Sequence, residues 1–533
     1  MKTNKIYAAI ASVFAFAACT DLNVDVVSQY TSYPDNDIAI EAKMADVYFH
    51  FREPMGRRYM EAQALASDEY TCLAFDGGYY DSGTYAHQAL HCSSPDDASI
   101  GWISDITAGI TKANKVIVDL GGNEAPAAAS ARAIRAYFTW MFMDNFGDTP
   151  ILDRIPEDGE TIARSSRKEV AEWIESELID VIPLLTEEVS ANTYGKPTKW
   201  MAEALLVKLY INWAVYTASS PDAYDASSST NTKLADCIKY CDDIINSGKF
   251  NLGSMEYRFK FAPTNGPEVE DFIYAMPYDA LTQTGMQYGR PRSFKSLKGM
   301  LPNYYGSSTA FTQSFGGNMV LTPEMADLFC LEGDQRNYCV LGGPVYNYDA
   351  KTLLPTSTPF EYKGAQVVFT KDITVKVKDN TIEVGSDVTA QSQGYHSIKF
   401  FLVPEDYNNG RNQSNDMPIF RYADILLTKA EAIVRGGGSG DAKGLFNQVR
   451  SYAKAPQLSS TPTLQDLLDE RGREFLDENW RRNDMIRFGT YEGQFFPHYT
   501  DWPDANFDKK HRIFPISTSV LNANPGWSQN PGY

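Results

Sequence analysis

Three glutamates at helical spacing are the group of residues in this sequence that most resembles a catalytic centre. Glu470, Glu474 and Glu478 are four residues apart, so on a helix they lie along one face. A pair of carboxyl groups is what a glycoside hydrolase requires. Five arginines occupy the same stretch: Arg471, Arg473, Arg481, Arg482 and Arg487. Ion pairs at this spacing keep carboxylates ionised at neutral pH, whereas a general acid needs a raised pKa. We therefore predict a structural ion-pair ladder.

A second group of potential ligands contains histidines and cysteines. His87 and His91 are one helical turn apart, Cys92 follows directly, and Cys72 lies upstream. Such residues bind zinc where they converge. Glycines before this stretch and a proline after it argue against a rigid helix, and no further ligand has an informative spacing. We predict no metal site and no cofactor.

Tyrosines and aspartates between positions 59 and 85 have the composition of a sugar-binding surface. They follow neither a helical nor a strand period, so they do not form one core stripe. An exposed ring offers a flat apolar face to a sugar, and a carboxylate accepts hydrogen bonds from its hydroxyls. Similar groups occur at 278–305 and at Tyr346 and Tyr348. The candidate ligand-binding residues are Asp68, Asp76, Tyr79, Tyr80, Asp81, Tyr85, Tyr288, Arg290, Tyr304 and Tyr305. The alternative is that the rings of each group pack an irregular interior.

The N-terminus has the features of a lipoprotein signal peptide. Lys2 and Lys5 precede an apolar run over residues 6–18 that is shorter than a membrane span. The sequence Phe-Ala-Ala-Cys at 16–19 resembles a lipobox, which predicts removal of residues 1–18 and lipidation of Cys19. The alternative is an ordinary secretory signal in which Cys19 has no role. We expect a lipid to be the only membrane anchor, because no later stretch of the sequence could span a bilayer.

Net charge and cysteine content narrow the class of protein further. The 533 residues carry a formal net charge of −20, which repels nucleic acid and anionic lipid and favours an uncharged or cationic partner. An exported protein can form disulfides. Cys72 with Cys92 and Cys330 with Cys339 enclose loop-like stretches and are the plausible pairs, with free buried cysteines as the alternative. Cys237 and Cys241 lie one helical turn apart, a geometry that disfavours a bridge between them.

Helical patterns at both ends of the chain must position these groups. Helices are predicted over 36–50, 100–120, 126–145, 167–188, 198–217, 232–247, 422–435, 441–453 and 464–488. Neighbouring helices joined by short turns predict a mainly α fold built on a tetratricopeptide-like scaffold of helical pairs.

The middle of the chain is different. From about 250 to 418 helical periodicity fades, and alternating apolar residues on both sides of Asp379-Asn380 predict a β-hairpin. We expect a single unit over 19–533. It would comprise a helical scaffold at about 36–250 and 420–490, a loop-rich ligand face at about 250–418 with a few short strands, and a loop tail at about 490–533.

Three segments of the sequence resemble the SusD/RagB family of outer-membrane nutrient-binding lipoproteins. They are RYADILL with AEA at 421–432, ERGREF and the residues after it at 470–489, and the C-terminal stretch 514–533. Segments at 135–138, 146–150 and 196–205 are also similar to that family, so the resemblance spans nearly the whole mature chain.

The resemblance implies a helical scaffold that carries an irregular ligand face and has no catalytic residues. Family members cap a TonB-dependent transporter of the SusC type and deliver oligosaccharides, or in some cases peptides. Ligand loops near the first aromatic group favour Tyr79 and Tyr80. We therefore expect a lipid-anchored outer-membrane protein, facing the cell exterior, that binds oligosaccharide. A peptide-binding lipoprotein and a secreted glycoside hydrolase that uses carboxylates of the first aromatic group are the alternatives.

Overall fold

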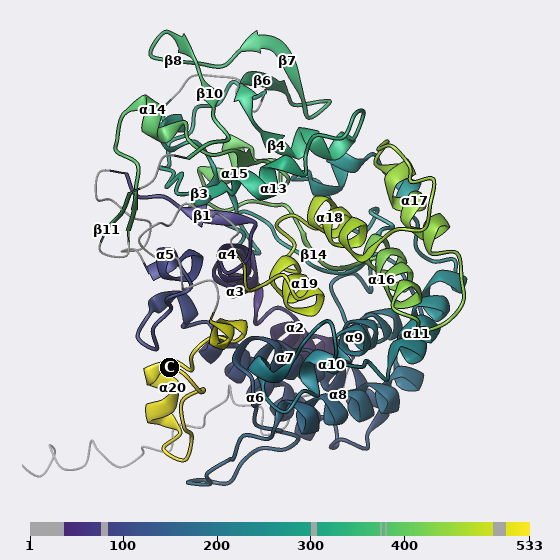
Figure 1. Ribbon diagram of the computed structural model, residues 1–533. Coiled ribbons are helices and arrows are strands. Elements are labelled where there is room, and N and C mark those ends of the chain that lie inside the picture. Colours follow the sequence, from purple (N-terminus) through teal and green to yellow (C-terminus); the bar gives the residue numbers. More distant parts are fainter. Residues whose placement is uncertain (1–36, 76–83, 300–305, 374–375, 379–380, 494–507) are drawn as a thin grey trace, which may run out of the picture. The chain divides into compact units, whose positions relative to one another are not determined.

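The first half of the chain forms a stack of helices, as the sequence predicts. Its long members are α6 (Ile103–Asp119), α7 (Ala129–Phe146), α8 (Arg167–Val181), α9 (Lys199–Ile211) and α11 (Leu234–Asn246). Each packs against the next, from α6 on α7 to α9 on α11, and Figure 1 shows them in blue to teal. This succession of packed neighbours is the helical-pair scaffold predicted from the sequence.

Local sequence signals explain why these helices start, stop and approach closely. α8 begins with a capping box in which Ser166 and Glu169 bond each other's backbone N–H groups. α7 ends at Gly147, whose φ of 82° favours glycine. Gly109 lets α6 pack tightly on α7, because a Cβ at this position would lie 2.8 Å from the ring of Phe138.

The computed structural model describes residues 37–75, 84–299, 306–373, 376–378, 381–493 and 508–533. Contacts divide the chain into a unit over residues 1–45 and a larger unit over residues 46–533, which holds the features discussed below. The predicted signal peptide and Cys19 lie outside the described residues. Within the described part of the chain, no helix is long and apolar enough to cross a membrane.

Shorter helices connect the larger elements. They are α2 (Asp37–Tyr48), α3 (Arg52–Gly56), α4 (Arg58–Leu65), α5 (Thr84–Ala89), α10 (Trp213–Tyr216), α12 (Gly289–Arg292), α13 (Pro323–Asp327), α14 (Val388–Gln391), α15 (Pro404–Tyr407) and α20 (Thr518–Ala523).

The C-terminal helices complete the same stack. They are α16 (Tyr422–Val434), α17 (Ala442–Tyr452), α18 (Leu464–Glu474) and α19 (Arg481–Phe488). α16 packs against α11, α17 and α18. The prediction of one continuous helix over 464–488 is wrong. The first helix ends at Glu474, and the turn before α19 contains two non-glycine residues with positive φ, Asp477 at 66° and Asn479 at 71°.

Strands among the described residues form seven two-stranded sheets, all antiparallel. The pairs are β1 (Tyr70–Cys72) with β3 (Met319–Leu321), β2 (Phe272–Met276) with β14 (Met417–Arg421), β4 (Val340–Leu341) with β13 (His396–Ser397), β5 (Gly343–Pro344) with β10 (Val368–Phe369), β6 (Tyr346–Asp349) with β7 (Leu354–Pro359), β8 (Glu361–Tyr362) with β9 (Ala365–Gln366), and β11 (Lys376–Lys378) with β12 (Thr381–Glu383). The β11–β12 pair confirms the predicted hairpin.

The irregular middle of the chain has an aromatic core of its own. Phe294, Phe311 and Tyr348 belong to one buried cluster, in which the rings of Phe315 and Tyr407 stack with centroids 4.4 Å apart. These loops therefore hold their shape by packing, although regular hydrogen-bonded structure is sparse there.

Candidate ligand-binding face

The described ends of both aromatic segments meet beside the β1–β3 pair. The first segment leaves β1 through Ala74 and Phe75, and Ala74 accepts a hydrogen bond from the N–H of Val384, next to β12, at 3.1 Å. The second segment approaches through the 3-10 turn η8 (Lys295–Leu297), where Lys295 Nζ lies 4.8 Å from the centroid of the Phe75 ring. Figure 1 shows β1, β3 and β11 near one another. We call this region the candidate face.

An apolar cluster forms the floor of the candidate face. It contains Leu73, Phe75, Leu90, Val320 and Ile373. Packing is close there, because a Cβ at Gly394 would come within 2.4 Å of the Val320 side chain. Several predicted ligand-binding residues lie outside the described residues: Asp76, Tyr79, Tyr80, Asp81, Tyr304 and Tyr305. Their role stays a prediction.

Three predicted ligand-binding residues are instead buried. Tyr85 and Tyr288 are each 2% exposed, and the Tyr288 hydroxyl lies 2.6 Å from Ser397 Oγ and 3.0 Å from Asp477 Oδ2. Asp68 accepts two hydrogen bonds from the Arg481 guanidinium, at 2.6 and 2.7 Å. The irregular spacing of the aromatic residues predicted exposed side chains, but the loops that carry them fold around a core. The prediction that these three residues bind ligand is therefore wrong.

Arg290 is the described candidate that reaches the surface. It lies on α12, is partly exposed, and donates from Nη1 to Gln287 Oε1 at 3.3 Å. Its backbone carbonyl accepts a hydrogen bond from the N–H of Gly316 at 2.8 Å. This bond holds the start of the second aromatic segment against the residues that precede β3.

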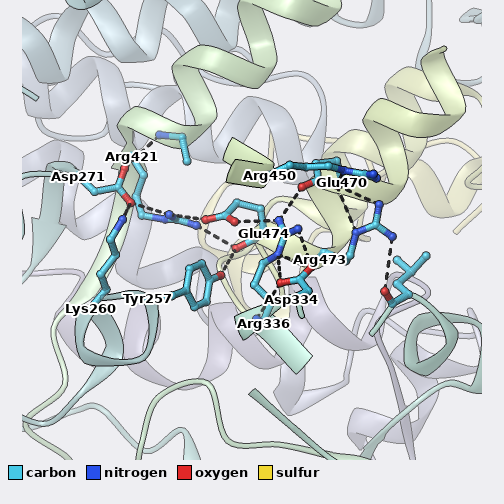
Figure 2. A network of polar contacts seen from close by, with 12 residues as sticks. Tyr257, Lys260, Asp271, Asp334, Arg336, Arg421, Arg450, Glu470, Arg473 and Glu474 are labelled. Atoms are coloured by element: carbon cyan, nitrogen blue, oxygen red, sulfur yellow. Dashed lines mark hydrogen bonds and ion pairs between the residues drawn. The ribbon is translucent and has the colours of Figure 1, made fainter. Parts of the chain in front are cut away.

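Glu470, Glu474 and Glu478 lie in the protein interior. Figure 2 shows Glu474 within a network of charged side chains. Glu474 accepts hydrogen bonds from Arg421 at 2.8 Å and from Arg336 at 3.1 Å, while Glu470 accepts one from Arg336 at 2.7 Å. Glu478 accepts two from Arg421, at 2.7 and 2.8 Å. Exposure of these carboxylates is at most 2%, so no substrate can reach them.

The electrostatics of this network also oppose acid catalysis. Burial alone would raise the pKa of Glu470, but Arg336, Arg473 and Arg450 outweigh it and hold the pKa at about 2. A group with such a pKa cannot donate a proton near neutral pH. The predicted structural role stands, but its form is extended: besides the pair of Glu470 with Arg473 along α18, most pairs join different elements in the interior.

Of the two alternatives for the cysteines, the structure shows free thiols and neither plausible disulfide, and the suggested zinc ligands do not converge. The six described cysteines remain thiols: Cys72, Cys92, Cys237, Cys241, Cys330 and Cys339. His87 Nδ1 lies 2.9 Å from Asp97 Oδ1, whereas the His91 ring stacks on Tyr491 with centroids 5.1 Å apart. In the described ranges no three His, Cys, Asp or Glu side chains are arranged to hold a metal ion.

Two family models match this chain. The model described as "SusD family" matches residues 270–533, and the model described as "Starch-binding associating with outer membrane" matches residues 24–211. The chain is 24% identical over 438 residues to the starch-binding protein SusD of Bacteroides thetaiotaomicron, covering 76% of this chain and 72% of that protein. It is 22% identical over 444 residues to SusD-like protein P25 of Formosa agariphila, covering 79% and 76%.

Solved structures show the same fold. Surface glycan-binding protein A of Bacteroides thetaiotaomicron, in complex with laminarihexaose, superposes with a TM-score of 0.66 at 19% identity, covering 93% of this chain and 99% of that one. Surface glycan-binding protein A of Bacteroides uniformis gives a TM-score of 0.70 at 17% identity, with the same coverage. These similarities agree with the mainly helical, tetratricopeptide-like architecture described above.

Proposed function

Because this chain belongs to the SusD family, we propose that it binds oligosaccharides at the cell surface and catalyses no reaction on them. The observation that carries the proposal is the pair of family matches, one to each half of the chain, together with relatives named for binding starch and for binding glycans.

The proposal includes delivery of the bound oligosaccharide to a SusC-like, TonB-dependent transporter in the outer membrane. A lipid on Cys19 would hold the protein there, facing the cell exterior, as the signal peptide and lipobox predict.

We assign the ligand to the candidate face. The described ends of two aromatic segments with the composition of a sugar-binding surface meet there, at Phe75, Lys295 and the β1–β3 pair. Tyr79 and Tyr80 in the first segment, and Tyr304 and Tyr305 in the second, would supply rings for stacking on sugar faces. Arg290 would supply hydrogen-bond donors.

A glycoside hydrolase function receives less support from the structure than glycan binding does. Its carboxylate pair cannot come from Glu470, Glu474 and Glu478, which are buried and ion-paired, nor from Asp68, which is bound to Arg481. Glu69 in the same group is also buried, at 1% exposed. Asp76 and Asp81 remain, and they lie outside the described residues.

Direct binding tests the proposal. Lipid-free protein that starts after Cys19 would be titrated calorimetrically with starch, laminarin and other oligosaccharides, and with a set of peptides. Release of reducing sugar would be measured in the same mixtures. We expect saturable binding to at least one glycan without release of sugar. Binding of peptides alone, or glycan cleavage at catalytic rates, would contradict the proposal.

A further inference from the structure

The β6–β7 hairpin and the strands beside it form a small layer that lies wholly within the described residues. Val345, between β5 and β6, joins the layer together. Its N–H donates to the carbonyl of Val367 at 2.9 Å, and its carbonyl accepts from the N–H of Phe360, also at 2.9 Å. All three side chains are buried in the aromatic core of the irregular region. Figure 1 shows β6, β7, β8 and β10 together, in green. The inner face of the layer is therefore firmly anchored.

The outer face of this layer carries exposed apolar side chains. Pro344 and Tyr346 are exposed on either side of the buried Val345, so they share the outer face. In the strand register Tyr346 is opposite Pro359 and Pro344 is opposite Val368, which places all four on one face. Tyr346 is 36% exposed and Val368 is 45% exposed. We call Pro344, Tyr346, Pro359 and Val368 the hairpin strip.

The Tyr346 ring is available to a ligand. Among the described residues no aromatic ring packs against it, no cation lies over it, and its hydroxyl has no hydrogen-bond partner. The nearby Tyr362 ring differs, because Phe294 packs edge-on against it at 5.6 Å and Lys363 Nζ lies 5.2 Å from its centroid. The turn after β6 is held by Asp349 Oδ1, which accepts hydrogen bonds from two backbone N–H groups at 2.7 and 3.0 Å. Tyr346 is thus a preorganised ring.

Uncharged hydroxyl groups lie beside the hairpin strip. The register of β6 and β7 is interrupted after Tyr346, and residues 356–358 of β7, Thr-Ser-Thr, are exposed there. Thr356 Oγ1 donates to the carbonyl of Asn347 at 2.9 Å. Exposed residues of both signs border this surface: Asp349, Lys351, Glu361 and Lys363. Their charges cancel, and the net charge of −20 repels anions. The surface therefore suits an uncharged ligand.

Size and backbone chemistry favour a sugar over a protein partner. A stable protein interface uses about 20–30 residues a side, many more than the hairpin strip and its hydroxyl neighbours provide. A partner strand is also opposed at β7, because Pro355 and Pro359 have no N–H to donate. A flat apolar ring with hydroxyl groups beside it is what one or two sugar units need.

We propose that the hairpin strip is a second contact for a long, uncharged polysaccharide, in which Tyr346 stacks on a sugar ring and the hydroxyls at 356–358 bind its OH groups. This inference rests on the proposed function and adds a site outside the candidate face. A second contact on the same polymer raises the affinity for the polymer. It leaves the affinity for a fragment unchanged when that fragment is too short to reach both sites.

Chain length separates the two sites in an experiment. Lipid-free wild type and Tyr346→Ala would be titrated calorimetrically with amylopectin, laminarin and xylan, and with hexasaccharides of the same linkages. Affinity for the polysaccharide that binds should fall about fivefold, as expected for one lost ring stack, whereas affinity for its hexasaccharide should not change. Tyr346→Phe should keep most of the polymer affinity, because it keeps the ring. Tyr338→Ala is the matched control: Tyr338 is 42% exposed on η9 (Gln335–Cys339), and its loss should change neither affinity.

Several results would overturn the inference and leave the proposed function standing. They are unchanged polymer affinity in Tyr346→Ala, equal weakening of polymer and hexasaccharide, and binding of charged glycans alone or of short oligosaccharides alone. A fall in the melting temperature of Tyr346→Ala would assign the ring to the core. Altered sedimentation of that variant without ligand, at unchanged polymer affinity, would make the hairpin strip an interface between copies of the chain. Failure to bind any glycan refutes both proposals.

Discussion

Replacing Glu474 with glutamine should destabilise the protein without affecting its ligand. The Glu474 carboxylate is fully buried and accepts hydrogen bonds from Arg421 and Arg336. Glutamine keeps the shape but removes the charge, and its NH₂ group would face a guanidinium that can only donate. Loss of one partner from a buried ion pair costs about 3–5 kcal/mol. We expect the lower value, about 3 kcal/mol, because both arginines retain other carboxylate partners.

Differential scanning calorimetry of the lipid-free protein measures this effect. For a unit the size of residues 46–533, an unfolding entropy of about 2 cal/mol/K per residue gives ~1 kcal/mol/K in total, so the melting temperature should fall by ~3 °C. Glycan affinity per folded molecule should not change, because the side chain cannot reach the surface.

Glu187→Gln is the matched control. Glu187 pairs with Lys199 at 2.6 Å, but its side chain is 59% exposed. An exposed pair contributes about 0–1 kcal/mol, so this melting temperature should fall by ~1 °C or less. Equal shifts in the two variants would refute the structural reading of the buried network. So would a selective loss of glycan affinity in Glu474→Gln at normal stability.

Three further predictions concern the pH dependence of stability, the lipid on Cys19 and the state of the cysteines. Basic partners outweigh the effect of burial and hold the pKa values of Asp271, Glu431 and Glu470 at about 2. Their contribution to stability is therefore present above the unfolded-state pKa of about 4 and is lost as the pH falls toward 2, so a melting curve between pH 7 and 3 should drop; a flat profile contradicts this. Cys19→Ala should lose acyl labelling and become soluble, as the lipobox predicts; a variant that stays on membranes in the absence of the transporter contradicts this. Thiol titration of the unfolded lipid-free protein should give the same count with and without reductant, and Cys330, which is exposed, should react before unfolding.

Sequence periodicity was sufficient to predict the helical scaffold. The predicted helix over 232–247 is α11 (Leu234–Asn246), and the one over 422–435 is α16 (Tyr422–Val434). The break after Glu474 could not be predicted, because it contains neither glycine nor proline. The positive φ angles of Asp477 and Asn479 are imposed by tertiary contacts, such as the hydrogen bonds of Asp477 with Arg292 and Tyr70.

The sequence did not predict which residues in the irregular middle of the chain are buried. The residues around Tyr288 have the composition of a ligand-binding loop, yet its hydroxyl donates a hydrogen bond to Asp477, 189 positions away in the sequence. Such long-range pairing leaves no local periodicity to read.

The central claim is that the candidate face binds a glycan through aromatic stacking. Its most direct test is calorimetric titration of the wild type and the Tyr79→Ala, Tyr80→Ala double variant with the best glycan from a screen. Each stacked ring should contribute about 1 kcal/mol beyond burial, so loss of both should weaken affinity about thirtyfold while the melting temperature barely changes. Unchanged affinity in the double variant would contradict the account of this face, and a collapse of the melting temperature would assign both rings to the core.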